Sequence, residues 1–199
     1  MDIILASGSP RRKQLLAQMG IETFRVISSD ADETVEPGLS PARIVEILSA
    51  RKAEAVADHA KPGGLVIAAD TIVALDDAVL GKPNDGLEAF RMLSALSGRR
   101  HQVYTGVTLL RDGERRTEHE VTTVTFRELT QDDITRYIAT GEPMDTAGAY
   151  GIQGYGALLV ERIEGDYFNV MGLPVCRLGR MLAGMGTDCL ALAAGNRGQ

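Results

Sequence analysis

The sequence predicts a mixed α/β fold in a single domain of ordinary size. Short stretches of β-branched and aliphatic residues alternate with segments whose apolar residues recur at helical spacing, which is the pattern of an α/β layer. A strong hairpin signal between two long strands adds antiparallel pairing. The chain has 199 residues, of which 44% are hydrophobic and 24% charged, so it has the composition of a domain that buries its own core. Disordered, collagen-like and coiled-coil proteins are thereby excluded.

Each element follows from a short local pattern. The pairs Ser9-Pro10 and Ser40-Pro41 mark helix starts, because serine caps a helix and proline fits its first position. Turns are expected at residues 76–77 and at Asp112-Gly113, whose residue types tolerate positive φ. The predicted strands cover residues 3–6, 24–27, 65–75, 79–80, 102–110, 115–127 and 157–163, and the predicted helices cover 10–19, 41–61, 87–96, 132–139 and 174–182.

The composition and the two ends of the sequence limit the classes of protein that it can belong to. We expect residues 1–185 to form one domain, followed by a flexible tail over 186–199. The apolar runs are too short for a bilayer, and Asp2 stands where a signal peptide carries positive charge, so we expect a cytoplasmic protein without membrane partners. The net charge of −6 argues against nucleic acid as a partner. Cys176 and Cys189 lack disulfide or zinc spacing and are expected to be buried, inert thiols.

The first chemical motif, residues 7–13, joins a predicted strand to a predicted helix. Helix N-termini attract anions, Gly8 allows close backbone approach, and arginine donors match pairs of phosphate oxygens. The motif is not a P-loop, and simple capping of the helix would also explain its serine and proline. Phosphate binding and helix capping are therefore both open at this point.

Asp70 is an acid in the middle of an apolar strand. Because burying an unpaired carboxylate costs several kcal/mol, Asp70 is expected to face a cleft, bind a metal, or pair with a lysine or arginine. The acidic loop at Asp32 and Glu33 supplies further carboxylates, as Mg²⁺ prefers, although such a loop is also ordinary solvated surface. Lys52 and Lys82 are candidate phosphate cations, and surface lysines are the alternative.

The glycine-rich segment 148–156 lets the backbone pass close to a ligand, while Gln153 offers both a donor and an acceptor. A mobile turn is the alternative interpretation of this segment. The three histidines have no spacing typical of a metal cluster or a catalytic triad, so structural roles are expected for them.

Taken together, these motifs resemble the Maf family of nucleoside triphosphate pyrophosphatases, also called septum formation inhibitors, and within it the dTTP/UTP pyrophosphatase branch. The resemblance covers roughly residues 3–182. The segments that carry it, in family order, are ASGSPRR at 6–12, ADTIV at 69–73, GKP at 81–83, AGAYGIQG at 147–154 and NVMGLP at 169–174.

The resemblance implies an elongated mixed sheet with flanking helices and two lobes around a central cleft, similar to inosine triphosphate pyrophosphatase. It implies hydrolysis of dTTP and UTP, or of modified pyrimidine nucleotides, to the monophosphate and pyrophosphate. It also implies a divalent cation, Mg²⁺ or Mn²⁺, and a possible homodimer.

The resemblance also assigns roles to individual residues. Asp70 is implied as general base or metal ligand, with Glu33 as a second residue at the metal. The residues implied around the phosphates are Ser7, Arg12, Lys52 and Lys82, and those implied in base selection are Arg11, Thr71 and Gln153.

One position departs from the family pattern. Thr146 follows Asp145 where the family often has lysine, which puts in question the cation that this lysine would supply. Two alternatives to the dTTP/UTP activity stay open: a 7-methyl-GTP pyrophosphatase of the same family, and a non-catalytic nucleotide-binding regulator of septum formation. The pair Thr71 and Gln153 argues against the first alternative. An intact Asp70 and Lys82, together with the negative charge, argue against the second.

Overall fold

A computed structural model describes residues 1–76 and 78–196 of the chain. The chain divides into two compact units, which are described separately. Unit 1 comprises Met1–Asp70, Thr105–Glu120 and the chain from Gly172 on, and unit 2 comprises Thr71–Tyr104 and Val121–Met171. Strands β3 (Leu65–Leu75), β5 (Arg100–Arg111) and β6 (Glu114–Phe126) contribute residues to both units.

The strands form one mixed sheet, as the sequence predicts. Its order is β2-β1-β3-β5-β6-β7, with β4 paired to β3. Strand β1 (Ile3–Leu5) runs parallel to both β2 (Arg25–Val26) and β3. Strands β4 (Ala78–Leu80) and β7 (Val160–Glu164) run antiparallel to β3 and β6 respectively.

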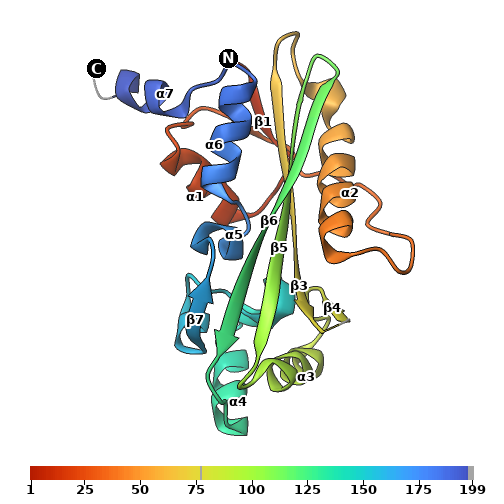
Figure 1. Cartoon of the computed structure of the whole chain (residues 1–199), viewed down its shortest axis with the longest axis vertical. Helices are drawn as coiled ribbons and strands as arrows, with labels where there is room; N and C mark the ends of the chain where they lie inside the picture. Colours follow the sequence, from red (N-terminus) through yellow and green to blue (C-terminus); the bar gives the residue numbers. More distant parts are fainter. Residues whose placement is uncertain (77, 197–199) are drawn as a thin grey trace. The chain divides into compact units, whose positions relative to one another are not determined.

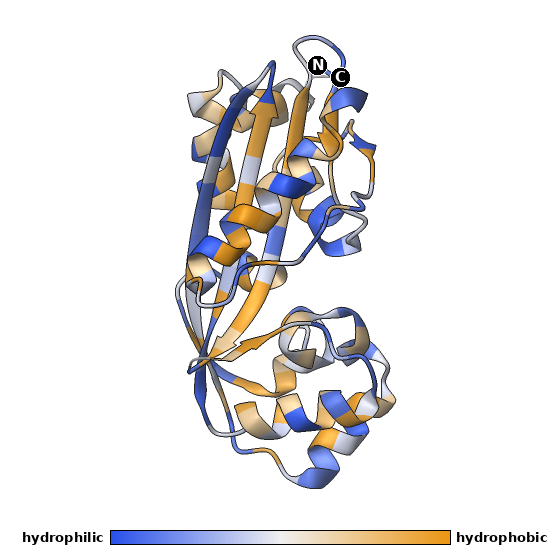
Figure 2. Cartoon of the chain, turned by 90° about the vertical axis from the view of Figure 1, so that its right-hand side faces the viewer, coloured by the Kyte–Doolittle hydropathy of each residue, from blue (hydrophilic) through white to orange (hydrophobic). Residues whose placement is uncertain are grey.

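In unit 1, helices cover both faces of the strands. Helix α2 (Pro41–Glu54) lies on one side, and α1 (Pro10–Gln18) and α6 (Val175–Gly184) lie on the other (Figure 1). Figure 2 shows that the inner strands are mostly hydrophobic, whereas α2 in front of them also carries hydrophilic residues. The core between β1, β3 and the end of α2 is made of small and branched aliphatic side chains, namely Ile4, Ala6, Ala53, Val56, Val66 and Ala68.

Helix α2 lies directly against strand β5 at Gly106. A Cβ atom on Gly106 would lie 2.2 Å from the carbonyl oxygen of Val45 and 2.4 Å from its carbonyl carbon. A glycine inside a strand commonly marks such a close approach of two backbones. The absence of a side chain at Gly106 therefore sets how close α2 lies to the sheet.

The hairpin between β5 and β6 confirms the turn predicted at Asp112-Gly113. Asp112 has φ of 48° and Gly113 has φ of 84°, the two positive values that a type I′ turn requires. This turn twists in the same sense as the flanking strands and fixes their register.

In unit 2, helices α3 (Gly86–Leu96) and α4 (Gln131–Ala139) pack against each other. Three edge-to-face rings, those of His101, Phe126 and Tyr150, lie in its core with centroids 4.7 to 5.5 Å apart. His101 is buried and its Nε2 lies 2.9 Å from the Tyr150 hydroxyl. Burial lowers the pKa of His101 from 6.5 to about 4, so the ring is neutral at neutral pH.

Several short elements differ from the sequence prediction. The strand predicted from residue 157 begins at Val160, because residues Tyr155–Leu158 form the 3-10 turn η4. The side chain of Glu142 accepts the first two N–H groups of this turn. Helix α5 (Tyr167–Met171) has no predicted counterpart. Helix α7 (Cys189–Asn196) occupies most of the segment expected to be a tail, and residues 197–199 lie outside the described chain. Of the turn expected at residues 76–77, residue 77 also lies outside it.

The expectation of two buried thiols is wrong. Cys176 is exposed and Cys189 is half-buried. Cys176 lies in the first turn of α6, two residues before the buried Leu178, and therefore on the opposite side of the helix. Burial raises the pKa of the Cys189 thiol, and the neighbouring Asp188 carboxylate raises it further.

Candidate active site

A lysine and two carboxylates meet in unit 1. The Nζ atom of Lys52 lies 2.5 Å from Oδ1 of Asp70 and 2.8 Å from Oε1 of Glu33. Strand β3 provides Asp70, helix α2 provides Lys52, and the loop between β2 and α2 provides Glu33. The side chains of Lys52 and Asp70 are only 15% and 11% exposed, whereas Glu33 is 66% exposed. The buried aspartate thus pairs with a lysine, one of the outcomes that its position in an apolar strand predicts.

The turn between β1 and α1 fixes an arginine near this cluster. Arg12 donates from Nη1 to the hydroxyl of Ser7 at 3.1 Å and from Nε to the carbonyl oxygen of Gly172 at 2.8 Å. Ser7 is buried, and its Oγ also accepts the N–H of Ser9 at 3.3 Å. Ser9 occupies the N-cap position of α1, as predicted, but its side chain makes no capping hydrogen bond. The serine that organises this turn is therefore Ser7.

Electrostatics couple Arg12 to the carboxylates of the cluster. Burial lowers the pKa of the Arg12 guanidinium, Asp70 and Glu33 act in the opposite direction, and Arg11 adds to the lowering. Arg11, Arg12 and Lys52 are three cations beside two carboxylates, so this part of unit 1 favours anionic ligands such as phosphates.

The donor set suits a hard divalent cation that shares its coordination with phosphates. Two carboxylate groups, those of Glu33 and Asp70, converge on the same ammonium. Mg²⁺ is usually held by one or two carboxylates together with substrate phosphates and water. Among the described residues no group of three or more His, Cys, Asp or Glu side chains is placed to hold a metal. Glu33 and Asp70 are two carboxylates that could take part in holding such a cation.

Unit 2 holds a second lysine–carboxylate pair. Nζ of Lys82 lies 2.5 Å from Oδ1 of Asp145, and both side chains are more than 60% exposed. The N–H of Gly148 donates to the carbonyl oxygen of Gly81 at 3.0 Å, which links the two loops that carry this pair. Thr146, which stands where the family often has lysine, is buried and donates its hydroxyl to the carbonyl oxygen of Pro143 at 3.0 Å.

The expected base-selecting residues of unit 2 lie at β3 and in the glycine-rich segment. Thr71 is half-buried and is the first residue of β3 that belongs to unit 2. Gln153 is exposed, while Ile152 beside it is buried. A Cβ atom on Gly151 would lie 3.1 Å from Nε2 of Gln153, so the amide of Gln153 lies over the bare backbone of Gly151.

The family model described as Maf-like protein matches residues 2–185 of the chain. The chain belongs to the Maf-like protein family. Among its curated relatives are proteins named dTTP/UTP pyrophosphatase. That of Bacillus cytotoxicus is 52% identical over 179 residues, which is 90% of this chain and 93% of the relative. That of Moorella thermoacetica is 52% identical over 188 residues, or 94% of this chain and 96% of the relative.

Similarity to solved structures is weaker. A HAM1 protein from Coxiella burnetii is 16% identical, with a TM-score of 0.49 over 92% of this chain and 99% of that one. The family assignment of this Maf-like protein therefore rests on the sequence matches, and its fold class rests on its own mixed sheet.

The structure places the predicted site residues of this Maf-like protein in two groups. Those in unit 1 are Ser7, Arg11, Arg12, Glu33, Lys52 and Asp70, and those in unit 2 are Thr71, Lys82 and Gln153. Within unit 1, contacts or electrostatic interactions connect all members of the group.

Sequence reasoning missed Glu142 and Tyr137. The carboxylate of Glu142 accepts hydrogen bonds from the N–H groups of Tyr155 and Gly156 and from the hydroxyl of Tyr137. The tyrosine lies in the last turn of α4 and the glutamate directly follows Gly141, whose φ of 77° suits the residue after a helix end. The N–H groups that Glu142 binds, those of Tyr155 and Gly156, lie more than ten residues further along the chain, so no local pattern links them to Glu142.

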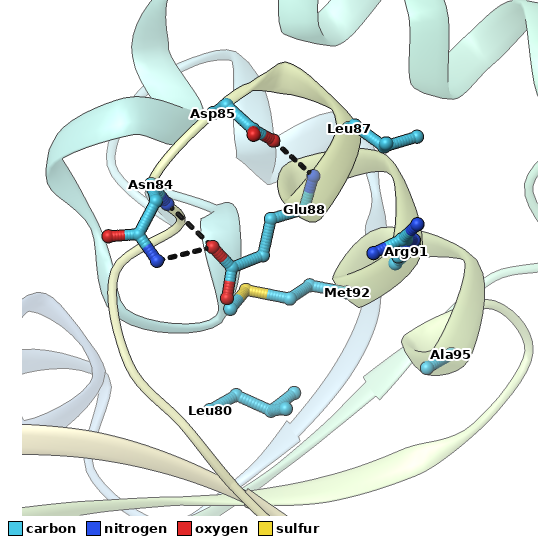
Figure 3. A pocket seen from close by; sticks show the side chains of 8 residues that line it. All are labelled: Leu80, Asn84, Asp85, Leu87, Glu88, Arg91, Met92 and Ala95. Atoms are coloured by element: carbon cyan, nitrogen blue, oxygen red, sulfur yellow. Dashed lines mark hydrogen bonds between the residues drawn. The ribbon is translucent and has the colours of Figure 1, made fainter.

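A hollow of about 450 Å³ lies beside helix α3 of this Maf-like protein, and none of the predicted site residues lines it (Figure 3). Its lining residues are Leu80, Asn84, Asp85, Leu87, Glu88, Arg91, Met92 and Ala95. Glu88 accepts from the N–H and side-chain amide of Asn84, and Asp85 caps the helix through the N–H of Glu88 (Figure 3). These three polar side chains are thus committed to the local structure of α3.

No helix in the described ranges 1–76 and 78–196 is long and apolar enough to cross a membrane.

Proposed function

We propose that this Maf-like protein hydrolyses dTTP and UTP to the monophosphate and pyrophosphate. The observation that carries the proposal is the cluster in which Lys52 bridges Asp70 and Glu33 beside the fixed guanidinium of Arg12. Relatives named dTTP/UTP pyrophosphatase support the same activity. They are 52% identical to this chain over more than nine-tenths of their own length.

In the reaction we propose, a water oxygen bonds to the α-phosphorus while the bond from that phosphorus to the pyrophosphate oxygen breaks. An oxygen of Asp70 takes the proton of the water, and Lys52 holds that carboxylate in place through its 2.5 Å contact. Lys52 and Arg12 also balance the negative charge that builds up on the phosphates, because cations already held in position stabilise charge that develops in the transition state. Ser7 acts through Arg12, whose guanidinium it orients.

Glu33 and Asp70 would hold a divalent cation, Mg²⁺ or Mn²⁺, which when bound neutralises phosphate charge and makes water more acidic. In the alternative role for Asp70, its carboxylate serves mainly as a ligand. Lys82 is proposed as a further cation that binds phosphate. Its side chain is exposed, so exchanging Asp145 for a phosphate as its partner costs little free energy.

Selection of the base is proposed to depend on Thr71 and Gln153, together with Arg11. A site that hydrogen-bonds the edge of uracil or thymine leaves polar groups unpaired when cytosine or a purine enters, which costs affinity. Because dTTP and UTP share this edge, one set of hydrogen bonds accepts both. A homodimer stays a prediction of the family resemblance, and a cytoplasmic location stays a prediction of the N-terminal residues and the short apolar runs.

The test is pyrophosphate release in the presence of Mg²⁺ from dTTP, UTP, CTP, dATP, GTP and 7-methyl-GTP. We expect release from dTTP and UTP ahead of the others, and a loss of about 10²- to 10⁴-fold in Asp70→Asn with nucleotide binding retained. Asp76→Asn is the matched control, since Asp76 follows the same strand but forms an exposed ion pair with Arg99. Full turnover in Asp70→Asn would contradict the proposal, as would binding without turnover in the unmodified protein.

A second variant tests base selection. Gln153→Ala is expected to reduce the preference for UTP over CTP by about tenfold, because one polar edge contact is lost. The same panel measures this preference as a ratio of kcat/KM values. An unchanged ratio would remove Gln153 from the selection of the base.

A further inference from the structure

The backbone from Gly151 to Gly156 encloses one carboxylate. Oε2 of Glu142 accepts the N–H of Tyr155 at 2.8 Å, and Oε1 accepts the N–H of Gly156 at 2.9 Å. Oε1 also accepts the hydroxyl of Tyr137 at 2.7 Å, and the oxygen of that hydroxyl accepts the N–H of Gly151 at 3.1 Å. Both ends of the segment that carries Gln153 are thus bound, directly or through Tyr137, to Glu142.

The glycines of this segment are explained by the same carboxylate. A Cβ atom on Gly154 would lie 2.1 Å from Oε2 of Glu142. A Cβ atom on Gly156 would lie 2.6 Å from the carbonyl oxygen of Gly151 and 2.9 Å from the Tyr137 hydroxyl. These two glycines let the backbone close around Glu142 and Tyr137, a role beyond the close approach to a ligand and the mobile turn that the sequence left open.

Gln153 lies at the middle of the enclosed segment with its side chain exposed. Its neighbour Ile152 is buried, which anchors the backbone on one side, and the N–H groups bound by Glu142 anchor it on the other. A hydrogen-bonding group discriminates between bases only if it is held within about 0.5 Å of the productive geometry. The direction of the Gln153 amide therefore depends on this anchor.

We infer that Glu142, with Tyr137, is a positioning residue for base selection by Gln153. The inference rests on the proposed function, because it assigns to Gln153 the contact with the base. Glu142 does not itself contact substrate in this account. It acts by holding the segment from Gly151 to Gly156 in one conformation before the nucleotide binds, which reduces the entropy lost on binding.

The experiment uses the full chain with Glu142→Gln and Tyr137→Phe. A glutamine has nearly the same shape, but its NH₂ group would face a backbone N–H, so one anchoring bond is lost. Tyr137→Phe removes the hydroxyl that links Gly151 to Glu142. Asp132→Asn is the matched control, because Asp132 lies in the first turn of α4 and forms an exposed ion pair with Arg136 of the same helix.

Two quantities are measured for each variant: amide hydrogen exchange in residues 150–157, and kcat and KM for UTP and CTP. In Glu142→Gln and Tyr137→Phe we expect exchange to rise by about tenfold or more and the UTP to CTP ratio of kcat/KM to fall by about tenfold. The fall in kcat/KM for UTP should come mainly from a higher KM, with kcat changed less. Asp132→Asn should leave both the exchange and the ratio unchanged, because its ion pair with Arg136 is exposed.

The outcomes separate this inference from the proposed function. Faster exchange with an unchanged ratio, or an equal fall of kcat for UTP and CTP, overturns the positioning role while the hydrolase activity stands. Unchanged exchange in both variants overturns the anchor itself. An unmodified protein without preference for UTP overturns the proposed function, and the inference with it.

Discussion

Two lysine–aspartate pairs with the same 2.5 Å separation differ in almost everything else. In unit 1 the side chains of Lys52 and Asp70 are 15% and 11% exposed, and in unit 2 those of Lys82 and Asp145 are 63% and 68% exposed. An exposed pair contributes about 0 to 1 kcal/mol, because water screens it and ordering both side chains costs entropy. In a buried pair, each partner must offset the desolvation of the other. Two ion pairs of the same length therefore contribute differently to the stability of the two units.

The core of unit 2 shows another way to bury an ionisable group. His101 is 2% exposed and interacts with the neutral hydroxyl of Tyr150, without a charged partner within its aromatic cluster. Its pKa falls to about 4, so at neutral pH no charge is buried. Unit 1 buries charge in pairs, whereas unit 2 keeps its buried ring uncharged, and acid should affect the two arrangements differently.

The largest expected effect is the loss of stability in acid caused by His101. Its pKa is about 4 in the folded protein and 6.5 ordinarily, so between these values the unfolded chain binds the proton and the folded chain does not. The stabilisation is complete above pH 6.5 and is lost as the pH falls towards 4, amounting to about 3 kcal/mol. Urea unfolding at pH 7, 5.5 and 4.5 measures it.

His101→Gln supplies the control, because glutamine retains a polar end for Tyr150 but does not titrate. We expect the dependence of the free energy of unfolding on pH to become shallower in this variant. Equal slopes in the two proteins would show that other groups cause the acid sensitivity.

The next effect is that of removing Lys52. Lys52→Met leaves Asp70 and Glu33 close together without their shared cation, which should lower the free energy of unfolding by roughly 2 kcal/mol at pH 7. Urea unfolding at low and high salt measures the loss, and screening should reduce it only partly. If Lys52→Met were as stable as the unmodified protein, the contrast between the units would disappear.

The smallest expected effect is that of the matched change in unit 2. Lys82→Met should alter the free energy of unfolding by less than about 0.5 kcal/mol, because the pair with Asp145 is exposed. The same urea series measures this difference. A loss equal to that of Lys52→Met would mean that exposure does not distinguish the two pairs.

Much of the fold was predictable because its signals are local. Strand β3 has the predicted bounds, 65–75, since a continuous apolar run follows a Pro-Gly-Gly break. The starts of α1 and α2 at Pro10 and Pro41 and the turn at Asp112-Gly113 likewise depend on neighbouring residues. The short helix α5 and the 3-10 turn η4 were missed, because side-chain contacts rather than apolar periodicity determine them.

The residues of the candidate site could be proposed from the sequence, but their geometry could not. The family resemblance named Lys52, Asp70 and Glu33, and sequence alone does not record that one ammonium bridges both carboxylates. Glu142 escaped notice for the converse reason. Two of its partners are backbone N–H groups, which every residue but proline has, so no residue type at a fixed spacing reveals them.

Gly106 has no side chain, and this allows helix α2 to lie close to strand β5. The position of Lys52 on α2, and with it the contact to Asp70, depends on this separation. Val45, which lies against Gly106, is seven residues before Lys52 on α2, or about two turns, so both residues lie on the same side of the helix. Ordinary contact begins near 3.4 Å, so a single methyl group at Gly106 would push the helix backbone outward by about an ångström. Such a displacement would move the backbone that carries Lys52 away from the strand that carries Asp70 without altering either residue. The position of the Lys52 ammonium thus depends on a residue of strand β5, Gly106, that has no side chain.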